Sequence, residues 1–527
     1  MGPQHAPPAR LSRKRTVVLP LLLSFLAFLV AALYPRRFVV QMATSSFRDV
    51  LPDFWVLPAS PGARCHPVVG EPAPDPRAYA TSPTDPSVHV QLPLNCEDVK
   101  LSRRHGIAVF ACDPSRPVWN PVMGPLLDPS SRGAVWIQKY EHGDGHGKAT
   151  AVPLDDFPED YDYHPLGLAL YETSPTSVRL FSVNLGTRAS TIEVIDLTVT
   201  DAGEWRGRYV RTIAHPLATQ ASNSITPLSA TELLVTNMHM TMRRPPPLEQ
   251  TKAMLRGLYG TWAERLLAVP VSSAAAVPVM QVVENVIGTG WVAHVTFDDK
   301  VTMPAHSDLQ AFARGVDARV LTKGIPFANG IGLSPGLKNV VVSSTTSSGV
   351  YVYPVQRWTK SGKPDWNAAD VLGAPLFIPA PFLSDNVEVA PPLPGEPVLP
   401  DDPLDGAAIY VAGHPSLKDL EEMIAAPGQL ESMSGTWVAE IKYTGKTVPD
   451  ERPPVHAERF LPGTPPGWSV RTLLQTNGQG FVDENGVRVT IPAGSGTAWD
   501  RSRKGHGSFF VTGLYSPAPL LCTGRYK

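Results

Sequence analysis

Acidic and amide side chains stand inside apolar, strand-like stretches at several distant places in this sequence. They are Glu97, Asp98, Asn223, Asn329, Asp385 and Asn386. Taken one at a time, such residues are more common as turn formers than as ligands. A buried side-chain oxygen nevertheless needs a partner, and these oxygens are of the kind that calcium prefers.

Five of these residues together suit one calcium ion, which takes about six to eight oxygen ligands. The set is Glu97, Asn223, Asn329, Asp385 and Asn386. Its two carboxylates balance the charge of the ion. Oxygen ligands favour calcium over zinc, with magnesium or manganese as alternatives. Ligands so far apart in sequence can meet only if their segments surround a common axis, as the inner strands of a β-propeller do.

The elements that must position these residues are mainly strands. Short apolar runs separated by turn residues recur from about residue 90 onward, and 56 prolines and 42 glycines punctuate the chain. Helices do not alternate regularly with these runs, which argues against a parallel α/β sheet. A chain of 527 residues exceeds what one hydrophobic core usually holds, so one large propeller or two domains would fit.

One segment, 248–267, is predicted to be helical because its apolar residues form one stripe. The stripe contains Met254, Leu255, Leu258, Trp262, Leu266 and Leu267. We expect this helical insertion, at about 245–270, to pack against the sheets, and association with a membrane is the alternative.

The N-terminus predicts a single membrane anchor. Residues 17–34 are almost wholly apolar, and a helix of that length reaches about 27 Å, close to the ~30 Å hydrocarbon core. More basic residues precede this stretch than follow it, which places the N-terminus in the cytosol. We expect a cytosolic tail at 1–15, an anchor at 16–35, a stalk at 36–64 and the folded region, 65–527, in the secretory lumen or outside the cell. A cleaved signal peptide is the alternative.

Charge and cysteine content narrow the partners and the compartment. The 46 Lys and Arg nearly cancel the 48 Asp and Glu, which argues against nucleic acid as a partner. Four cysteines match no zinc motif and suit disulfides in an oxidising compartment. Cys96 and Cys112 flank one predicted turn, whereas Cys65 and Cys522 lie near opposite ends of the folded region and could close a ring.

A series of short motifs covers most of residues 95–415, and their order along the chain is more specific than any one of them. They include Cys96-Glu97-Asp98-Val99, His164-Pro165-Leu166-Gly167-Leu168, Val183-Asn184-Leu185, Asn223-Ser224-Ile225, Asn237-Met238-His239, Ala328-Asn329-Gly330, Ser384-Asp385-Asn386-Val387 and Gly413-His414-Pro415. In this order the motifs resemble the serum paraoxonase/arylesterase family. That resemblance implies an all-β, six-bladed β-propeller that hydrolyses esters or lactones with two calcium ions in its central tunnel. It also implies a disulfide between Cys65 and Cys522.

The resemblance assigns metal-binding roles to particular residues. It makes the five oxygen ligands above those of the catalytic calcium. It gives the second, structural calcium Asp98 and the backbone carbonyl of Leu168. Ser224 stands where the family has an aspartate on that second ion, which should weaken the site.

The chain departs from the family at the catalytic histidine dyad, where it has Leu166 and Leu185. Met238 also replaces an aspartate, without a clear consequence. We expect a calcium-dependent hydrolase of esters or lactones in which Asp385 activates water. His239 and His414 are weaker candidates for the base, as is His164.

Two other classes of function compete with this one. The missing dyad favours a non-catalytic calcium-stabilised propeller that binds ligands or proteins. The sequence 332–336 matches the G-x-S-x-G motif of serine hydrolases around Ser334, but a β-rich run follows it, so we expect a propeller turn. A Gly- and His-rich stretch at 141–146 is a further, weak metal candidate.

Overall fold

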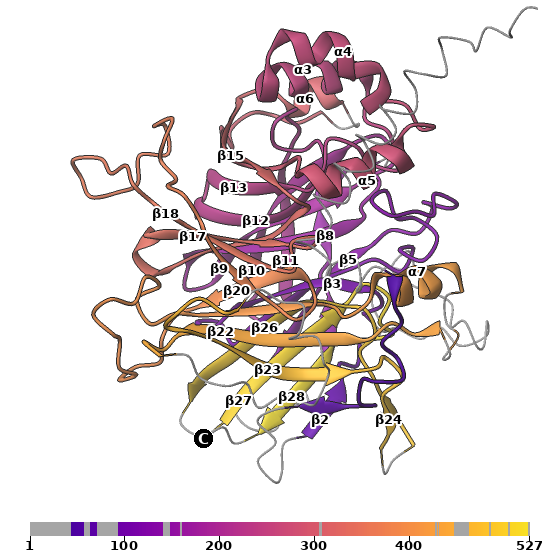
Figure 1. Ribbon diagram of the computed structural model, residues 1–527, viewed down its shortest axis with the longest axis vertical. Coiled ribbons are helices and arrows are strands. Elements are labelled where there is room, and N and C mark those ends of the chain that lie inside the picture. The colour runs from indigo at the N-terminus through magenta and orange to yellow at the C-terminus, as the bar shows by residue number, and fades with distance from the viewer. Residues whose placement is uncertain are drawn as a thin grey trace, which may run out of the picture.

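The computed structural model describes residues 44–56, 64–70, 93–140, 148–158, 161–304, 308–426, 429, 432–446, 463–483, 486–503 and 506–524. Their strands form six sheets of four or five strands and one two-stranded hairpin. Figure 1 shows how these elements follow one another through the molecule. We number the six sheets as blades 1 to 6 in chain order.

Blades 1 to 3 each start at their innermost strand. Blade 1 contains β3 (Cys96–Ser102), β4 (Ile107–Cys112), β5 (Ala134–Lys139) and β6 (Ala149–Ala151). Blade 2 contains β8 (Pro165–Ser174), β9 (Ser177–Leu185), β10 (Ser190–Val199) and β11 (Trp205–Ile213), with β7 (Leu154–Asp155) at its edge. Blade 3 contains β12 (Ser222–Ser229), β13 (Glu232–Asn237), β14 (Gly290–Phe297) and β15 (Val316–Ile325).

Blades 4 to 6 follow the same antiparallel plan. Blade 4 contains β16 (Ala328–Leu333), β17 (Asn339–Ser344), β18 (Gly349–Pro354) and β19 (Leu376–Pro379). Blade 5 contains β20 (Leu383–Ala390), β21 (Ala408–His414), β22 (Thr436–Tyr443), β23 (Trp468–Thr476) and β1 (Trp55–Val56). Blade 6 contains β26 (Gly494–Arg503), β27 (His506–Gly513), β28 (Leu520–Gly524) and β2 (Arg64–Pro67), and β24 (Phe481–Val482) and β25 (Arg488–Val489) form the hairpin.

The innermost strands close a ring. In sequence order β3, β8, β12, β16, β20 and β26 each contact the next, and β26 contacts β3. Six antiparallel sheets around one axis are a six-bladed β-propeller, so the predicted fold class is confirmed. The axis is where the predicted ligand residues were expected to meet.

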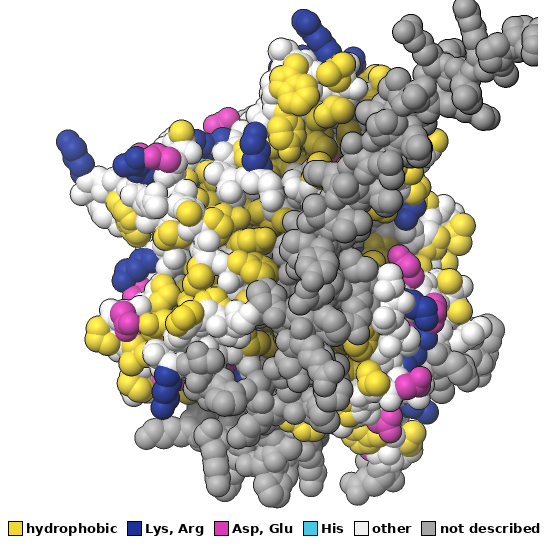
Figure 2. Space-filling model, viewed as in Figure 1, with side chains coloured by type: hydrophobic (Ala, Val, Ile, Leu, Met, Phe, Trp, Pro, Cys, Tyr) yellow, Lys and Arg dark blue, Asp and Glu magenta, His cyan; other side chains and the backbone are white. Residues whose placement is uncertain are grey.

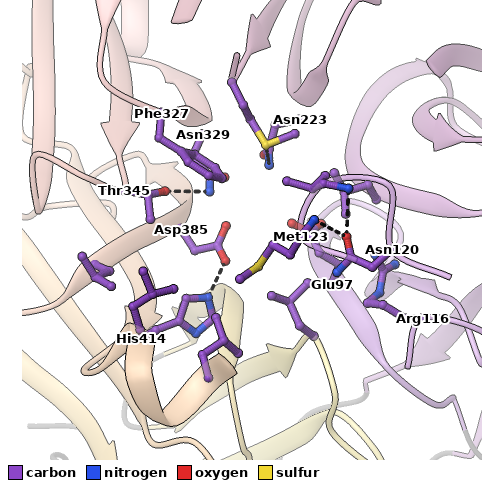
Figure 3. Close-up of a pocket in the computed structure, with 17 residues that line it drawn as sticks. Glu97, Arg116, Asn120, Met123, Asn223, Phe327, Asn329, Thr345, Asp385 and His414 are labelled. Atoms are coloured by element: carbon purple, nitrogen blue, oxygen red, sulfur yellow. Dashed lines mark hydrogen bonds and ion pairs between the residues drawn. The ribbon is translucent and has the colours of Figure 1, made fainter. Parts of the chain in front are cut away.

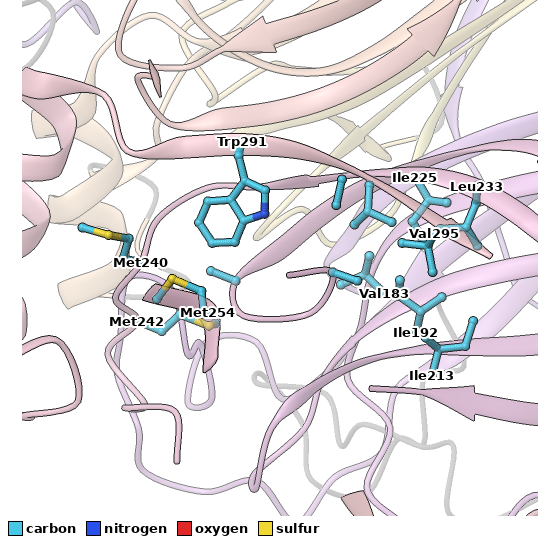
Figure 4. Close-up of a cluster of buried hydrophobic side chains, with 14 of the residues drawn as sticks. Val183, Ile192, Ile213, Ile225, Leu233, Met240, Met242, Met254, Trp291 and Val295 are labelled. Atoms are coloured by element: carbon cyan, nitrogen blue, oxygen red, sulfur yellow. The ribbon is translucent and has the colours of Figure 1, made fainter. Parts of the chain in front are cut away.

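Each gap between neighbouring blades is filled by its own hydrophobic cluster. Between blades 2 and 3, Ile192 and Ile213 pack against Leu233 and Val295, as Figure 4 shows. Because both faces of each sheet are covered in this way, a strand such as β4 is buried along its whole length. This explains why the strands appear in the sequence as continuous apolar runs instead of alternating patterns.

The N-terminal part of the described chain fastens the last two blades. β2 pairs with β28, and the Cys65–Cys522 disulfide joins these two strands, while Cys96–Cys112 joins β3 to β4. Both expected disulfides are confirmed. The described part of the predicted stalk at 36–64 is not a free stalk, because it packs against the propeller. Phe47 and Leu51 are buried in the cluster between blades 4 and 5, and β1 extends blade 5. Two apolar side chains that a free stalk would expose are thus used for packing.

The helical insertion consists of three helices instead of the one predicted: α3 (Leu248–Tyr259), α4 (Thr261–Val271) and α5 (Val277–Ile287). Gly260, with φ of 89°, separates α3 from α4. The predicted stripe is therefore broken. Its α3 part is buried, but Trp262 and Leu266 on α4 are 60% and 69% exposed. Figure 2 shows hydrophobic side chains gathered at this end of the molecule.

The shorter helices α6 (Leu309–Phe312) and α7 (Leu417–Ala425) lie between strands. Within the described residues, no helix is both long enough and apolar enough to span a bilayer. The predicted anchor at 16–35 lies outside those residues.

Candidate metal centre in the central tunnel

All five predicted calcium ligands lie where an inner strand loses register with its neighbour. The pairing slips between Cys96 and Asp98 in β3, which leaves Glu97 in a bulge. The corresponding slips in β12, β16 and β20 lie at 222–225, 328–331 and 384–387. They contain Asn223, Asn329, Asp385 and Asn386. A bulge bends the strand and redirects its side chains, so four bulges at one level of the tunnel can aim these groups at one point.

Glycines allow the inner strands to approach closely at this level. A Cβ at Gly167 would lie 2.2 Å from the backbone oxygen of Asn223, and one at Gly330 would lie 2.7 Å from Cα of Asn386. No larger residue fits at either position without moving the neighbouring strand. The glycines thus let the backbones that carry the ligand residues come together.

The three asparagines share one orientation, visible for two of them in Figure 3. Each donates a hydrogen bond from its side-chain Nδ2. Asn223 donates to Met238 Sδ at 3.3 Å, Asn329 to Thr345 Oγ1 at 3.0 Å, and Asn386 to Glu97 Oε1 at 2.8 Å. The Oδ1 atom of each is buried and has no hydrogen-bond partner among the described residues. Three amide oxygens are therefore left to accept.

The two carboxylates are placed in a similar way. Glu97 accepts from Asn386 through Oε1, and its buried Oε2 has no hydrogen-bond partner within the described chain. Asp385 binds His414 Nε2 at 3.0 Å through Oδ2. Burial, and then the like charges of Asp98 and Asp385, raise the pKa of Glu97 well above its ordinary value. A bound cation would stabilise the ionised form of these carboxylates.

These observations fit a bound cation, because an orphaned set of buried acceptors costs free energy until a donor or a metal ion satisfies it. The chain supplies two carboxylates and three amide oxygens, a donor set of the kind that calcium binds. In the parts of the chain that the structure describes, no three His, Cys, Asp or Glu side chains form a metal cluster by themselves. A cation bound here would therefore need the amide oxygens as ligands as well.

Polar and apolar side chains line one cavity at this centre. The polar ones include Glu97, Asn223, Asn329 and Asp385, together with His414. The apolar ones include Val122, Met123, Leu166, Phe327, Leu417, Leu420 and Leu514. This arrangement suits a ligand with one polar group held among apolar surroundings.

Comparisons with known proteins leave the family open. No protein-family model matches the sequence, and no curated protein matches it. A luciferin-regenerating enzyme aligns with a TM-score of 0.37 and 10% identity over 88% of this chain and 95% of its own. A putative 6-phosphogluconolactonase from Bacteroides fragilis gives 0.31 and 8% over 80% and 82%, and the periplasmic gluconolactonase of Pseudomonas aeruginosa gives 0.29 and 10% over 73% and 77%. Scores below 0.5 carry no argument about function, so the architecture rests on the strand order.

Two of the predicted histidine bases lie away from the cavity. His239 Nδ1 is 3.0 Å from Glu284 Oε2 on α5, and its ring packs on Phe327. His164 Nδ1 contacts both Ser115 Oγ and Asp113 Oδ2 at 3.1 Å. A serine nucleophile and its carboxylate would need different ring nitrogens, so this trio is not a catalytic triad. Only His414 of the three lines the cavity.

The remaining competing motifs are not part of this centre. Ser334 Oγ accepts a hydrogen bond from Asn339 N at 2.9 Å, and the turn Pro335–Leu337 leads directly into β17. The strand–turn–strand context excludes a nucleophile elbow, as predicted. The stretch at 141–146 lies outside the described residues.

The positions of the missing histidine dyad are apolar in the structure as well. Leu166 and Leu185 belong to the cluster between blades 2 and 3, and both are buried. Leu166 also forms part of the cavity wall. Neither of these two side chains can accept a proton.

Sequence reasoning missed three residues that shape the centre. Met238 had no interpretation, and its sulfur orients the Asn223 amide. Thr345 orients Asn329, and Arg116 is a buried cation that lines the cavity and donates to Pro165 O at 2.6 Å. Met238 stands in one of the motifs of the resemblance and Thr345 in the polar run 343–348, but neither pattern indicates that the side chain orients an amide.

Thr345→Val is expected to weaken calcium binding by about 10- to 100-fold, the usual effect of losing a group that orients a metal ligand. The valine cannot accept from Asn329 Nδ2, so the amide oxygen is no longer fixed toward the cavity. Calorimetric titration with calcium measures the change. Thr345→Ser keeps the hydroxyl and serves as the control, and equal affinities for the two variants would contradict this role.

Proposed function

We propose that this propeller is a calcium-dependent hydrolase of carboxylic esters or lactones. The observation that carries the proposal is the set of four buried oxygens without partners among the described residues, on Glu97, Asn223, Asn329 and Asn386, beside Asp385. Glu97, Asn223, Asn329, Asp385 and Asn386 would hold the ion. When bound, calcium would supply Lewis-acid polarisation of the carbonyl and stabilise the negative charge that develops on its oxygen.

His414 supplies the proton acceptor that the absent dyad cannot. An ionised Asp385 can only accept, so the hydrogen bond of 3.0 Å assigns the proton to Nε2 of His414. Nδ1 of the same ring is buried and without a partner in the described residues, which leaves its lone pair available. Asp385 thereby orients His414 for general-base removal of a proton from the attacking water, as a carboxylate does in a triad.

The apolar part of the cavity lining would bind the remainder of the substrate. Leu166 and Phe327 line the same cavity as the predicted ligand residues, so an aryl or alkyl group can bury its surface while the carbonyl lies near those residues. The proposal includes an oxidising compartment, because two disulfides hold the propeller together. The N-terminal anchor and a lumenal or extracellular location are part of it.

The alternative is a calcium-stabilised propeller that binds ligands without turnover, favoured by the apolar Leu166 and Leu185 at the dyad positions. Phenyl acetate and lactone hydrolysis by the purified protein separates the two. Hydrolysis that Asn329→Ala abolishes and Ser334→Ala leaves unchanged supports the proposal. Calcium binding without turnover of any ester or lactone would favour the binding protein, and turnover lost on Ser334→Ala would favour a serine esterase.

A further inference from the structure

We propose that the ammonium group of Lys100 takes the place of a second calcium ion in the tunnel of this propeller. The inference rests on the proposed calcium centre only for the identity of the ion. The resemblance implies a second ion on Asp98, Leu168 and the position of Ser224. The side chains found there do not fit it.

Asp98 already has its donors. Lys100 Nζ lies 3.0 Å from Oδ1, the backbone N–H of Val99 donates to the same oxygen at 2.9 Å, and the backbone N–H of Leu168 donates to Oδ2 at 2.9 Å. Asp98 is fully buried, and the Lys100 side chain is only 15% exposed. A carboxylate with three donors, one of them cationic, is neutralised without a metal ion.

The strand geometry explains how Lys100 reaches this place. Asp98 and Lys100 are two residues apart on β3, beyond the bulge at Glu97, so both side chains point to the same face of the blade. Lys100 also lines a separate cavity, formed by the far ends of the inner strands. Glu388, which lines that cavity too, is bound by Arg103 at 2.6 Å, and this leaves Asp98 as the carboxylate partner of Lys100.

The balance of charge favours one calcium. Glu97, Asp98 and Asp385 bring three negative charges to the tunnel. One calcium and Lys100 supply three positive charges, whereas a second ion would leave an excess of two in a buried site. Arg116, a cation that lines the first cavity, has a carboxylate partner of its own in Asp113: burial would raise the pKa of Asp113, but His164 and then Arg116 lower it.

Ser224 points to the same conclusion. It is fully buried, and its hydroxyl has no partner in the described residues, so it offers one neutral oxygen where the family has a carboxylate. The missing negative charge at 224 and the positive charge of Lys100 act together. Each makes a second divalent ion less favourable.

The test counts calcium ions bound per chain, by equilibrium dialysis and elemental analysis, in the wild type and in Lys100→Gln/Ser224→Asp. The double substitution removes the ammonium and returns the carboxylate, so we expect it to bind one more calcium than the wild type. Lys100→Arg/Ser224→Asn keeps the positive charge and adds no negative one, and it should match the wild type.

The outcomes are distinct from those of the proposed function. One ion in the wild type and two in the variant support both proposals. No ion in the wild type and one in the variant would refute the proposed function and still support this inference. Two ions in the wild type, or no extra ion in a folded variant, would overturn it. If the double variant does not fold, Lys100→Gln alone should lower the thermal midpoint and regain it with millimolar calcium. If calcium raised the thermal midpoint of Lys100→Gln by no more than it raises the midpoint of the wild type, the inference would be overturned.

Discussion

Asp385→Asn is expected to lower ester and lactone turnover about a thousandfold, because a single carboxylate serves two roles there. It carries one of the two negative charges of the calcium centre, and its Oδ2 fixes His414 through a hydrogen bond of 3.0 Å. General-base catalysis by a positioned side chain contributes about 10²- to 10⁴-fold, and a neutral amide can no longer favour the Nε2–H tautomer. Steady-state kinetics with phenyl acetate measures the loss, together with calcium affinity by calorimetry.

Two variants separate the roles of Asp385. His414→Gln should lose about a hundredfold in turnover and keep its calcium, since His414 acts on the proton and the metal ligands are intact. Asp402→Asn removes a charge from a buried aspartate in a loop, where the side chain accepts from Leu404 N and Gly406 N. An asparagine keeps only one of these two acceptor oxygens, but Asp402 does not line the cavity, so turnover should not change. Full activity in Asp385→Asn would show that this carboxylate is neither ligand nor orienting group.

Removing the Cys65–Cys522 disulfide is expected to cost about 6 kcal/mol of the free energy of unfolding in the loop-entropy model. The bond spans 457 residues and fastens β2, the edge strand of blade 6, to β28. Without it the unfolded chain gains the entropy of a very long loop, and β2 is retained only by its pairing with one neighbour. Urea unfolding of Cys65→Ser/Cys522→Ser measures the loss.

The second disulfide provides the matched comparison. Cys96–Cys112 spans only 16 residues, so its removal should cost less, about 3 kcal/mol in the same loop-entropy model. It also joins β3 to β4 directly beside Glu97, so its loss should weaken calcium binding more than the loss of Cys65–Cys522 does. A larger loss of stability from the short loop than from the long one would contradict the loop argument.

The sequence predicted the strands because fully buried strands such as β4 appear as apolar runs. The pairing of Cys65 with Cys522 came from the resemblance, since a bond that spans 457 residues leaves no local signal. The N-terminal segment was missed, because Phe47 and Leu51 are isolated apolar residues whose burial depends on a sheet more than 300 residues away. Gly260 could have indicated the break between α3 and α4. It was overlooked because apolar residues at helical spacing continue beyond it.

The sequence could predict that distant polar residues meet near the axis, but not how their side chains are positioned. Asn223 and Asn329 stood out as amides in apolar strands, and the structure places both in one cavity. The bulges that aim them depend on the register between strands, which no hydrophobic pattern encodes. The pairing of Lys100 with Asp98 could have been suspected from their spacing of two on one strand.

The most direct measurement of the central claim is the turnover of a lactone by the full-length protein after metal removal and stepwise return of calcium. Turnover should be absent from the metal-free protein and should rise in proportion to bound calcium until the one proposed centre is filled. Turnover that is indifferent to chelation, or a fully calcium-loaded protein that hydrolyses no ester or lactone, would contradict the account.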